Sequence, residues 1–135
     1  PFYYDIIDNI NYIKQNLGYD PTIVHARFIK PMDAKMLIDL SSSHDTIITV
    51  EEGTEIGGFG SGILEFISRN NININVKNIA IPDAYIEHAS RSEQLDQIGL
   101  SSQRIADNII SIGNSISKNK TVTKIVSLSK DVDQE

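Results

Sequence analysis

The sequence predicts an α/β fold, a three-layer sandwich with a mostly parallel central sheet. Helical and extended segments alternate along the chain, and this order is typical of parallel strands joined by right-handed crossovers. Apolar residues recur at helical spacing in the helical segments, whereas the extended segments are rich in β-branched residues. Proline, glycine and asparagine clusters separate the two kinds of segment. The 135 residues suffice for one such domain.

The N-terminal part of the chain predicts one helix followed by one strand. The helix is expected over residues 4–17 and ends at Gly18, because glycine readily adopts the left-handed conformation that terminates helices. Its apolar side chains share helical spacing: Ile6, Ile10, Ile13 and Leu17. After a short break, the β-branched residues from Thr22 onward begin a strand that continues toward Phe28.

The middle of the chain continues the alternation. Pro31 and Asp33 are expected to start a second helix, and the serine run before His44 ends it. Asparagines bond their own backbone in turns, so the asparagine-rich stretch marks a loop. The expected elements are a helix at 34–41, a strand at 46–50, a helix at 58–69, a loop at 70–75 and a strand at 76–81.

The C-terminal part is expected to hold a short helix at 92–98 and a long final helix capped by Ser101. The final helix has one apolar face: Ile105, Ile109, Ile112 and Ile116. Beyond it the chain is polar with only a weak alternation, and its acidic end is expected to be loosely held. The sequence therefore predicts a domain over residues 1–117 and a polar extension or tail over 118–135.

Composition argues against several classes of function. Hydrophobic residues make up 40% of the chain and charged residues 22%, which are ordinary values for a globular protein. The net charge of −6 argues against general nucleic-acid binding, because that activity needs a basic surface. The apolar runs are far shorter than the roughly 20 residues of a membrane helix, so no membrane association is expected.

The absence of cysteine excludes disulfides, thiolate metal ligands and a cysteine nucleophile. It also suits an intracellular compartment, and the start of the chain lacks the basic and apolar regions of a signal peptide. A cytoplasmic location is expected, or a plastid-type organelle if the source is eukaryotic. The chain begins on a helix without a methionine, so it is expected to be a piece of a longer protein.

The run from Val50 to Phe66 joins a strand, a glycine turn and a helix. Four glycines lie close together in it: Gly57, Gly58, Gly60 and Gly62. Their pattern, G-G-F-G-S-G, matches neither the dinucleotide motif G-x-G-x-x-G nor the phosphate loop G-x-x-x-x-G-K-[ST]. A nucleotide site is therefore disfavoured, and the glycines are interpreted as allowing close packing against another chain or domain.

Glu51 and Glu52 end the strand that precedes this turn. Adjacent strand residues point to opposite faces of a sheet, so these two carboxylates cannot form a shared acid–base pair. A buried carboxylate needs hydrogen-bond donors, and the amides of the glycine turn are the nearest ones. We expect Glu51 to brace the turn.

The three histidines, His25, His44 and His88, lie far apart in the sequence and show no metal-site spacing. His88 stands near Ser90 and Arg91, from which a serine–histidine–acid triad could be drawn, but no G-x-S-x-G elbow accompanies it. The serines of this segment are interpreted as a helix cap, and Arg91 as an ion-pair partner. No catalytic, cofactor-binding or metal-binding residue is expected in the chain.

Two cations, Arg27 and Lys30, stand at the end of the first predicted strand. Ligands of parallel sheets usually bind beyond the carboxyl ends of the strands, so these side chains could hold an anion there. Pairing with Glu51 or Asp33 is the favoured interpretation of these two cations. The candidate anion contacts of the chain are Arg27, Lys30, His88 and Arg91.

Three segments resemble the C-terminal domain of the transketolase superfamily of thiamine-diphosphate enzymes. They are ARFIKPMD at 26–33, TVEEGTEIGGFGSGILEFI at 49–67, and IPDAYIEHASRSEQLDQIGL at 81–100 with SSQRIADNI after it. The V-E-E-G and G-G-x-G pieces are shared across the superfamily. G-G-F-G-S-x-x-L-E-F and P-D-x-x-I-E-H-x-S-R are similar to the 1-deoxy-D-xylulose-5-phosphate synthase family. The resemblance covers roughly residues 4–116.

The resemblance implies a parent enzyme that condenses pyruvate with glyceraldehyde 3-phosphate, losing carbon dioxide. It implies that thiamine diphosphate and Mg²⁺ are held by other domains, because the G-D-G…N-N motif is absent here. This piece would then be inactive alone and would support interdomain and homodimer packing. The family strand that precedes the first helix has no counterpart in the chain. The residues expected to brace the turn or pack against a partner are Glu51, Gly57, Gly58, Phe59 and Gly60.

Two alternatives remain open from the sequence. One is the C-terminal domain of a 2-oxo acid dehydrogenase β subunit, whose partner would be an acyltransferase. The other is a small regulatory module that binds an anion at the end of the sheet.

Overall fold

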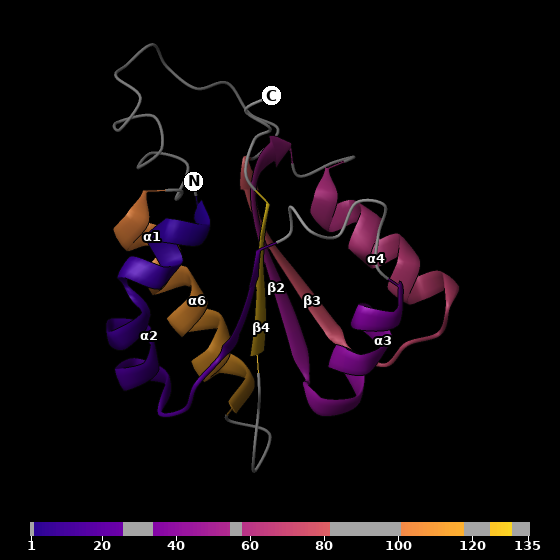
Figure 1. Cartoon of the computed structure of the whole chain (residues 1–135), viewed down its shortest axis with the longest axis horizontal. Helices are drawn as coiled ribbons and strands as arrows, with labels where there is room; N and C mark the ends of the chain where they lie inside the picture. Colours follow the sequence, from indigo (N-terminus) through magenta and orange to yellow (C-terminus); the bar gives the residue numbers. More distant parts are fainter. Residues whose placement is uncertain (1, 26–33, 55–57, 82–100, 118–124, 131–135) are drawn as a thin grey trace.

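The computed structural model describes residues 2–25, 34–54, 58–81, 101–117 and 125–130 (Figure 1). One layer of helices contains α1, α2 and α6, the other contains α3 and α4, and the sheet lies between them. The helices are α1 (Phe2–Asp8), α2 (Ile10–Leu17), α3 (Ala34–Ser43), α4 (Phe59–Arg69) and α6 (Ser102–Ser117). The strands are β1 (Thr22–His25), β2 (Thr46–Thr54), β3 (Asn75–Ile81) and β4 (Ile125–Lys130).

The four described strands form one parallel sheet in the order β1-β4-β2-β3. The predicted three-layer α/β sandwich with a parallel sheet is therefore confirmed. Where the chain leaves β2 toward α4, the pairing with β3 is irregular, and the register shifts between Val50 and Thr54. The regular ladder between β2 and β3 therefore ends near the carboxyl end of β2.

The core has two halves because β2 is buried on both faces. Ile48 and Val50 face the layer of α1, α2 and α6. Ile47, which alternates with them, faces α3 and α4. Each half is filled by isoleucine and leucine side chains from its helices: Ile6, Ile13, Leu17, Ile105 and Ile109 on one side, and Leu37, Ile63 and Ile67 on the other.

The first predicted helix is two helices, because the chain breaks at Asn9. The Asn9 side chain donates to the Asp5 carbonyl at 2.8 Å and to Ser102 Oγ at 2.7 Å. Asparagine competes in this way with the backbone bonds of a helix, and here it also ties the break to α6. The predicted end of the second piece is confirmed, since Gly18 adopts a left-handed conformation with φ of 84°.

A second hydrogen bond, at the protein surface, links two helices of the layer that contains α1, α2 and α6. The Tyr12 hydroxyl donates to the Asp107 carboxylate at 2.8 Å, and this bond and the carboxylate's charge raise the pKa of Tyr12 above its ordinary value. Gln103 donates to the same carboxylate oxygen at 3.1 Å. The bond links α2 to α6.

The sequence-based division at residue 117 is wrong for Ile125–Lys130. This segment is β4, which pairs with β1 on one side and with β2 on the other. Its polarity and weak alternation predicted an extension. Main-chain pairing on both sides is what makes a strand central, and composition indicates such pairing only indirectly. The last described strand therefore belongs to the middle of the sheet.

The bounds of the other predicted helices and strands differ little from those in the structure, where the structure describes them. The helix predicted at 34–41 reaches Ser43, and the strand predicted at 46–50 reaches Thr54. The continuation of the first strand toward Phe28 and the short helix at 92–98 lie outside the described residues. None of the described helices is both long enough and apolar enough to cross a membrane.

Thr46 offers a stability test in this core. It is fully buried, and its hydroxyl has no hydrogen-bond partner among the described residues. An unmade hydrogen bond of a buried group costs about 1–3 kcal/mol, so Thr46→Val is expected to raise the free energy of unfolding by about 1 kcal/mol. Urea unfolding followed by circular dichroism measures this change.

Thr49→Val is the matched control, because Thr49 is equally buried in the same strand but its hydroxyl donates to Asn78. The control is expected to lower stability. Equal shifts in the same direction for both variants would contradict the account of Thr46.

Candidate functional site

The candidate site lies where β2 ends and α4 begins. Glu51, near the carboxyl end of β2, is only 3% exposed. One of its oxygens accepts a hydrogen bond from the Phe59 amide at 2.8 Å, and the other accepts from the Gly60 amide at 2.5 Å. A single carboxylate thus bonds two successive amides in the first turn of α4.

This contact explains how α4 can begin directly after Gly58. The first amides of a helix have no partner within the helix, and Gly58 has no side chain to cap them. Glu51 supplies both acceptors from the neighbouring strand. Its negative charge also lies at the positive end of the helix dipole, which is favourable. The two amides in turn satisfy a carboxylate that would be costly to bury alone.

Gly60 is required by close packing beneath the helix. A Cβ at this position would lie 2.5 Å from Asn78 Oδ1 and 2.7 Å from Thr49 Oγ1. These two side chains face each other across paired positions of β2 and β3, and Thr49 donates to Asn78 at 2.6 Å. The first turn of α4 therefore lies directly over the hydrogen-bonded pair of Thr49 and Asn78. Only glycine at position 60 leaves room for these two side chains.

Gly60→Ala is expected to lower the free energy of unfolding by about 1–3 kcal/mol, because overpacking forces neighbours to move. Thermal or urea unfolding measures the loss. The double variant Gly60→Ala/Asn78→Ala removes the clash between the new Cβ and the Asn78 side chain. Its loss of stability should therefore be clearly smaller than the sum of the losses of the two single variants.

Strict additivity of the two losses would contradict the packing account of Gly60. A loss from Gly60→Ala cannot come from helix propensity, because alanine has a higher helix propensity than glycine.

The structure brings three of the sequence-predicted site residues together and leaves others untested. Glu51 contacts Phe59 and Gly60, and Gly58 immediately precedes them. Phe59 is half-buried and packs against the half of the core that lies between the sheet and helices α3 and α4. The remaining candidates lie outside the described residues: Gly57, Arg27, Lys30, His88 and Arg91.

Sequence reasoning missed Thr49 and Asn78. A usable signal was present, since Thr49 and Glu51 are two residues apart on one strand and therefore share a face. Asn78, in contrast, could be assigned only from the register between β2 and β3.

The two described histidines have separate structural surroundings. His44 Nε2 lies 2.8 Å from the Thr22 hydroxyl, and its Nδ1 lies 3.1 Å from the Leu40 carbonyl, so this ring ties the end of α3 to the start of β1. The His25 ring stacks on Tyr3 with ring centroids 4.5 Å apart. Within the described ranges, no three histidine or acidic side chains come close enough together to hold a metal ion.

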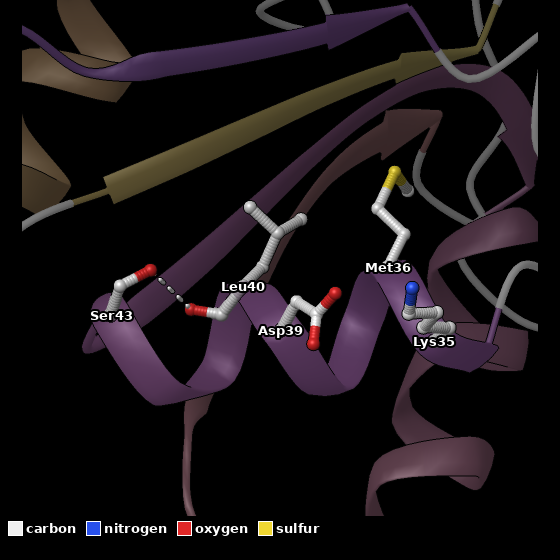
Figure 2. A pocket seen from close by; sticks show the side chains of 5 residues that line it. All are labelled: Lys35, Met36, Asp39, Leu40 and Ser43. Carbon is white, nitrogen blue, oxygen red and sulfur yellow. Dashed lines mark hydrogen bonds between the residues drawn. The ribbon is translucent and has the colours of Figure 1, made fainter.

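A shallow hollow of about 430 Å³ lies along α3 (Figure 2). It is lined by Lys35, Met36, Asp39, Leu40 and Ser43. Met36 and Leu40 point toward the sheet, while the two charged residues are exposed and of opposite sign. The hollow therefore gathers no convergent set of buried polar groups of the kind that fixes a small ligand.

Comparison with known proteins adds a family and a set of relatives. The family model described as "Transketolase, C-terminal domain" matches residues 6–105. The 1-deoxy-D-xylulose-5-phosphate synthase of Aquifex aeolicus is 48% identical over 83 residues, which cover 62% of this chain and 13% of that protein. The synthase of Brevibacillus brevis is 43% identical over 99 residues, covering 73% of this chain and 16% of that protein.

A third synthase, from Natranaerobius thermophilus, is 36% identical over 107 residues. These residues cover 78% of this chain and 17% of that protein. The chain thus spans only a small part, between 13% and 17%, of the length of these curated relatives.

Proposed function

Because this chain belongs to the transketolase C-terminal domain family, we propose that it is the C-terminal domain of a 1-deoxy-D-xylulose-5-phosphate synthase. The parent enzyme would be a thiamine-diphosphate-dependent transferase that condenses pyruvate with glyceraldehyde 3-phosphate and releases carbon dioxide. This piece would support the other domains and a second subunit, without activity of its own. The shared name of the relatives favours this parent over a 2-oxo acid dehydrogenase β subunit.

The supporting role is inferred from the hydrogen bonds of the Glu51 carboxylate. An acid–base or metal-binding carboxylate needs an oxygen that can reach a substrate or ion. Both oxygens of Glu51 instead accept from amides of α4, and the side chain is buried. Among the described residues of the conspicuous V-E-E-G…G-G-F-G run, Glu51 thereby links the carboxyl end of β2 to the first turn of α4.

The described residues do not fit thiamine diphosphate or its magnesium. Glu51 is the buried carboxylate among them, and its lone pairs are already directed at two amides. We therefore assign both groups to the remaining domains of the parent protein, and no step of the reaction is attributed to this chain.

The proposed packing role centres on the start of α4. The backbone amide of Phe59 donates a hydrogen bond to the buried Glu51, and this bond fixes the backbone that carries the ring. Half-buried aromatic residues on a fixed backbone are suited to anchor a partner at low entropic cost. We propose that the contact with another domain or subunit is made at the half-buried Gly58 and Phe59, whereas Gly60 is buried against Thr49 and Asn78 within the domain.

An assay of the chain alone tests its lack of activity. Pyruvate, glyceraldehyde 3-phosphate, thiamine diphosphate and Mg²⁺ are supplied, and product is followed. We expect no turnover above the protein-free background. Turnover at the rate of a complete synthase would overturn the proposal.

The packing role needs a separate experiment. The remaining domains of the parent protein are produced apart, and their association with this chain is followed by sedimentation velocity. A complex is expected, and it should weaken when Phe59 is replaced by alanine. Two folded partners that never sediment together would rule the role out.

A further inference from the structure

The side chain of Asn78 makes a hydrogen bond with its oxygen only. Asn78 Oδ1 accepts from the Thr49 hydroxyl at 2.6 Å, across paired positions of β2 and β3. Its nitrogen, Nδ2, has no hydrogen-bond acceptor among the described residues. A carboxamide nitrogen carries two N–H donors. Within the part of the chain that the structure describes, Asn78 therefore holds two donors that are not used.

Two neighbours hold this carboxamide in place. Thr49, which bonds its oxygen, is fully buried in β2. Gly60 in the first turn of α4 packs against it so closely that a Cβ there would lie 2.6 Å from Asn78 Cγ. A side chain that is already immobilised loses little conformational entropy when it binds a partner. The donors of Asn78 are thus preorganised.

Asn78 also lies close to the proposed contact surface. It is half-buried, and its strand, β3, pairs with β2 but with no other described strand. Gly60, which packs against it, directly follows Phe59, the aromatic residue proposed to contact a partner. Protein interfaces combine such apolar anchors with hydrogen bonds from neighbouring polar groups. Phe59 and Asn78 together provide both kinds of group.

The charge near Asn78 favours a neutral acceptor. The Glu51 carboxylate bonds the Gly60 amide, and Gly60 is the residue that packs on Asn78, so a negative charge lies close by. The chain as a whole carries a net charge of −6. A carboxylate on a partner would meet like charge here, which is unfavourable. Most side-chain hydrogen bonds within proteins are made with the backbone, so a main-chain carbonyl is the acceptor that fits.

We propose that Asn78 is the polar part of the contact begun by Phe59, and that its Nδ2 donates to a main-chain carbonyl in the remaining domains of the parent protein. This inference rests on the proposed packing role of the chain. The chain spans only 13% to 17% of the length of its curated relatives, so most of the parent protein is available to supply that carbonyl.

Asn78→Asp tests the two donors. The variant keeps the size of the side chain and an oxygen for Thr49, but it removes both N–H groups. Sedimentation velocity of the full chain with the separately produced remaining domains measures the affinity. We expect the complex to be weaker by about tenfold or more. Asn75→Asp, an exposed change of equal charge in the same strand, is the matched control and should stay within about twofold of wild type.

The outcomes separate this inference from the packing role. Wild-type affinity of Asn78→Asp, in an experiment where Phe59→Ala weakens the complex, would overturn the inference and leave the packing role intact. Tighter binding of Asn78→Asp would show that the partner presents a donor, and it would overturn the inference too. A wild-type chain that forms no complex would overturn both.

Asn78→Asp adds a charge near Glu51, so a second measurement uses the unchanged chain. Nuclear magnetic resonance of the chain with isotope-labelled asparagine follows the exchange of side-chain amide protons with water. On addition of the remaining domains, exchange at Asn78 Nδ2 should slow by about tenfold or more, because its protons become hydrogen-bonded. Exchange at Asn75 should not change. Equal exchange rates at Asn78 in the free and the bound chain would contradict the inference.

Discussion

Ser127→Pro is expected to unfold the domain or to lower its free energy of unfolding by at least about 3 kcal/mol. Ser127 lies in β4, opposite Ile23 of β1 and Ile48 of β2. Every amide of a central strand faces one of two neighbours, so a proline there removes a ladder bond and places its ring against the adjacent strand. Because β4 joins β1 to the described sheet, the damage should extend beyond one bond.

Urea unfolding by circular dichroism measures the change, and Ser127→Ala is the control because it keeps the backbone amide. The control is expected to change stability far less than the proline does. A proline variant as stable as wild type would mean that residues 125–130 are not a central strand.

Glu51→Ala is expected to lower the free energy of unfolding by about 3 kcal/mol, since hydrogen bonds to a charged group are worth about 1.5–3 kcal/mol each. The variant leaves the Phe59 and Gly60 amides without their acceptor and removes a charge from the positive end of α4. Glu51→Gln keeps one acceptor oxygen but turns an amide group toward the other backbone amide. It should cost about half as much as the alanine.

Thermal and urea unfolding measure this series, and Glu65→Ala is the matched control. Glu65 is an exposed carboxylate on α4 itself, and its removal should stay within about 0.5 kcal/mol. Losses of similar size for Glu51→Ala and Glu65→Ala would show that Glu51 does not hold the helix.

The layered fold could be predicted from the sequence because its signals are local. The apolar run that becomes β2, the helical spacing of isoleucines in α2 and α6, and Gly18 each report on their own surroundings. Glu51 could be paired with the turn amides on similar grounds, since a buried carboxylate needs donors and few were near.

The rest depends on contacts between distant parts of the chain. The break at Asn9 is fixed by a bond to Ser102, and the need for glycine at position 60 depends on Asn78 in another strand. The central place of β4 depends on pairing with strands from the start and middle of the sequence. None of these partners can be identified from spacing along the chain.

The most direct test of the account is the kinetics of the complete parent protein carrying Glu51→Gln. If this junction supports the enzyme and takes no part in chemistry, the melting temperature should fall while kcat and KM for pyruvate stay at wild-type values below the transition. A tenfold or larger fall in kcat, with the melting temperature and the mass of the assembled protein unchanged, would contradict it.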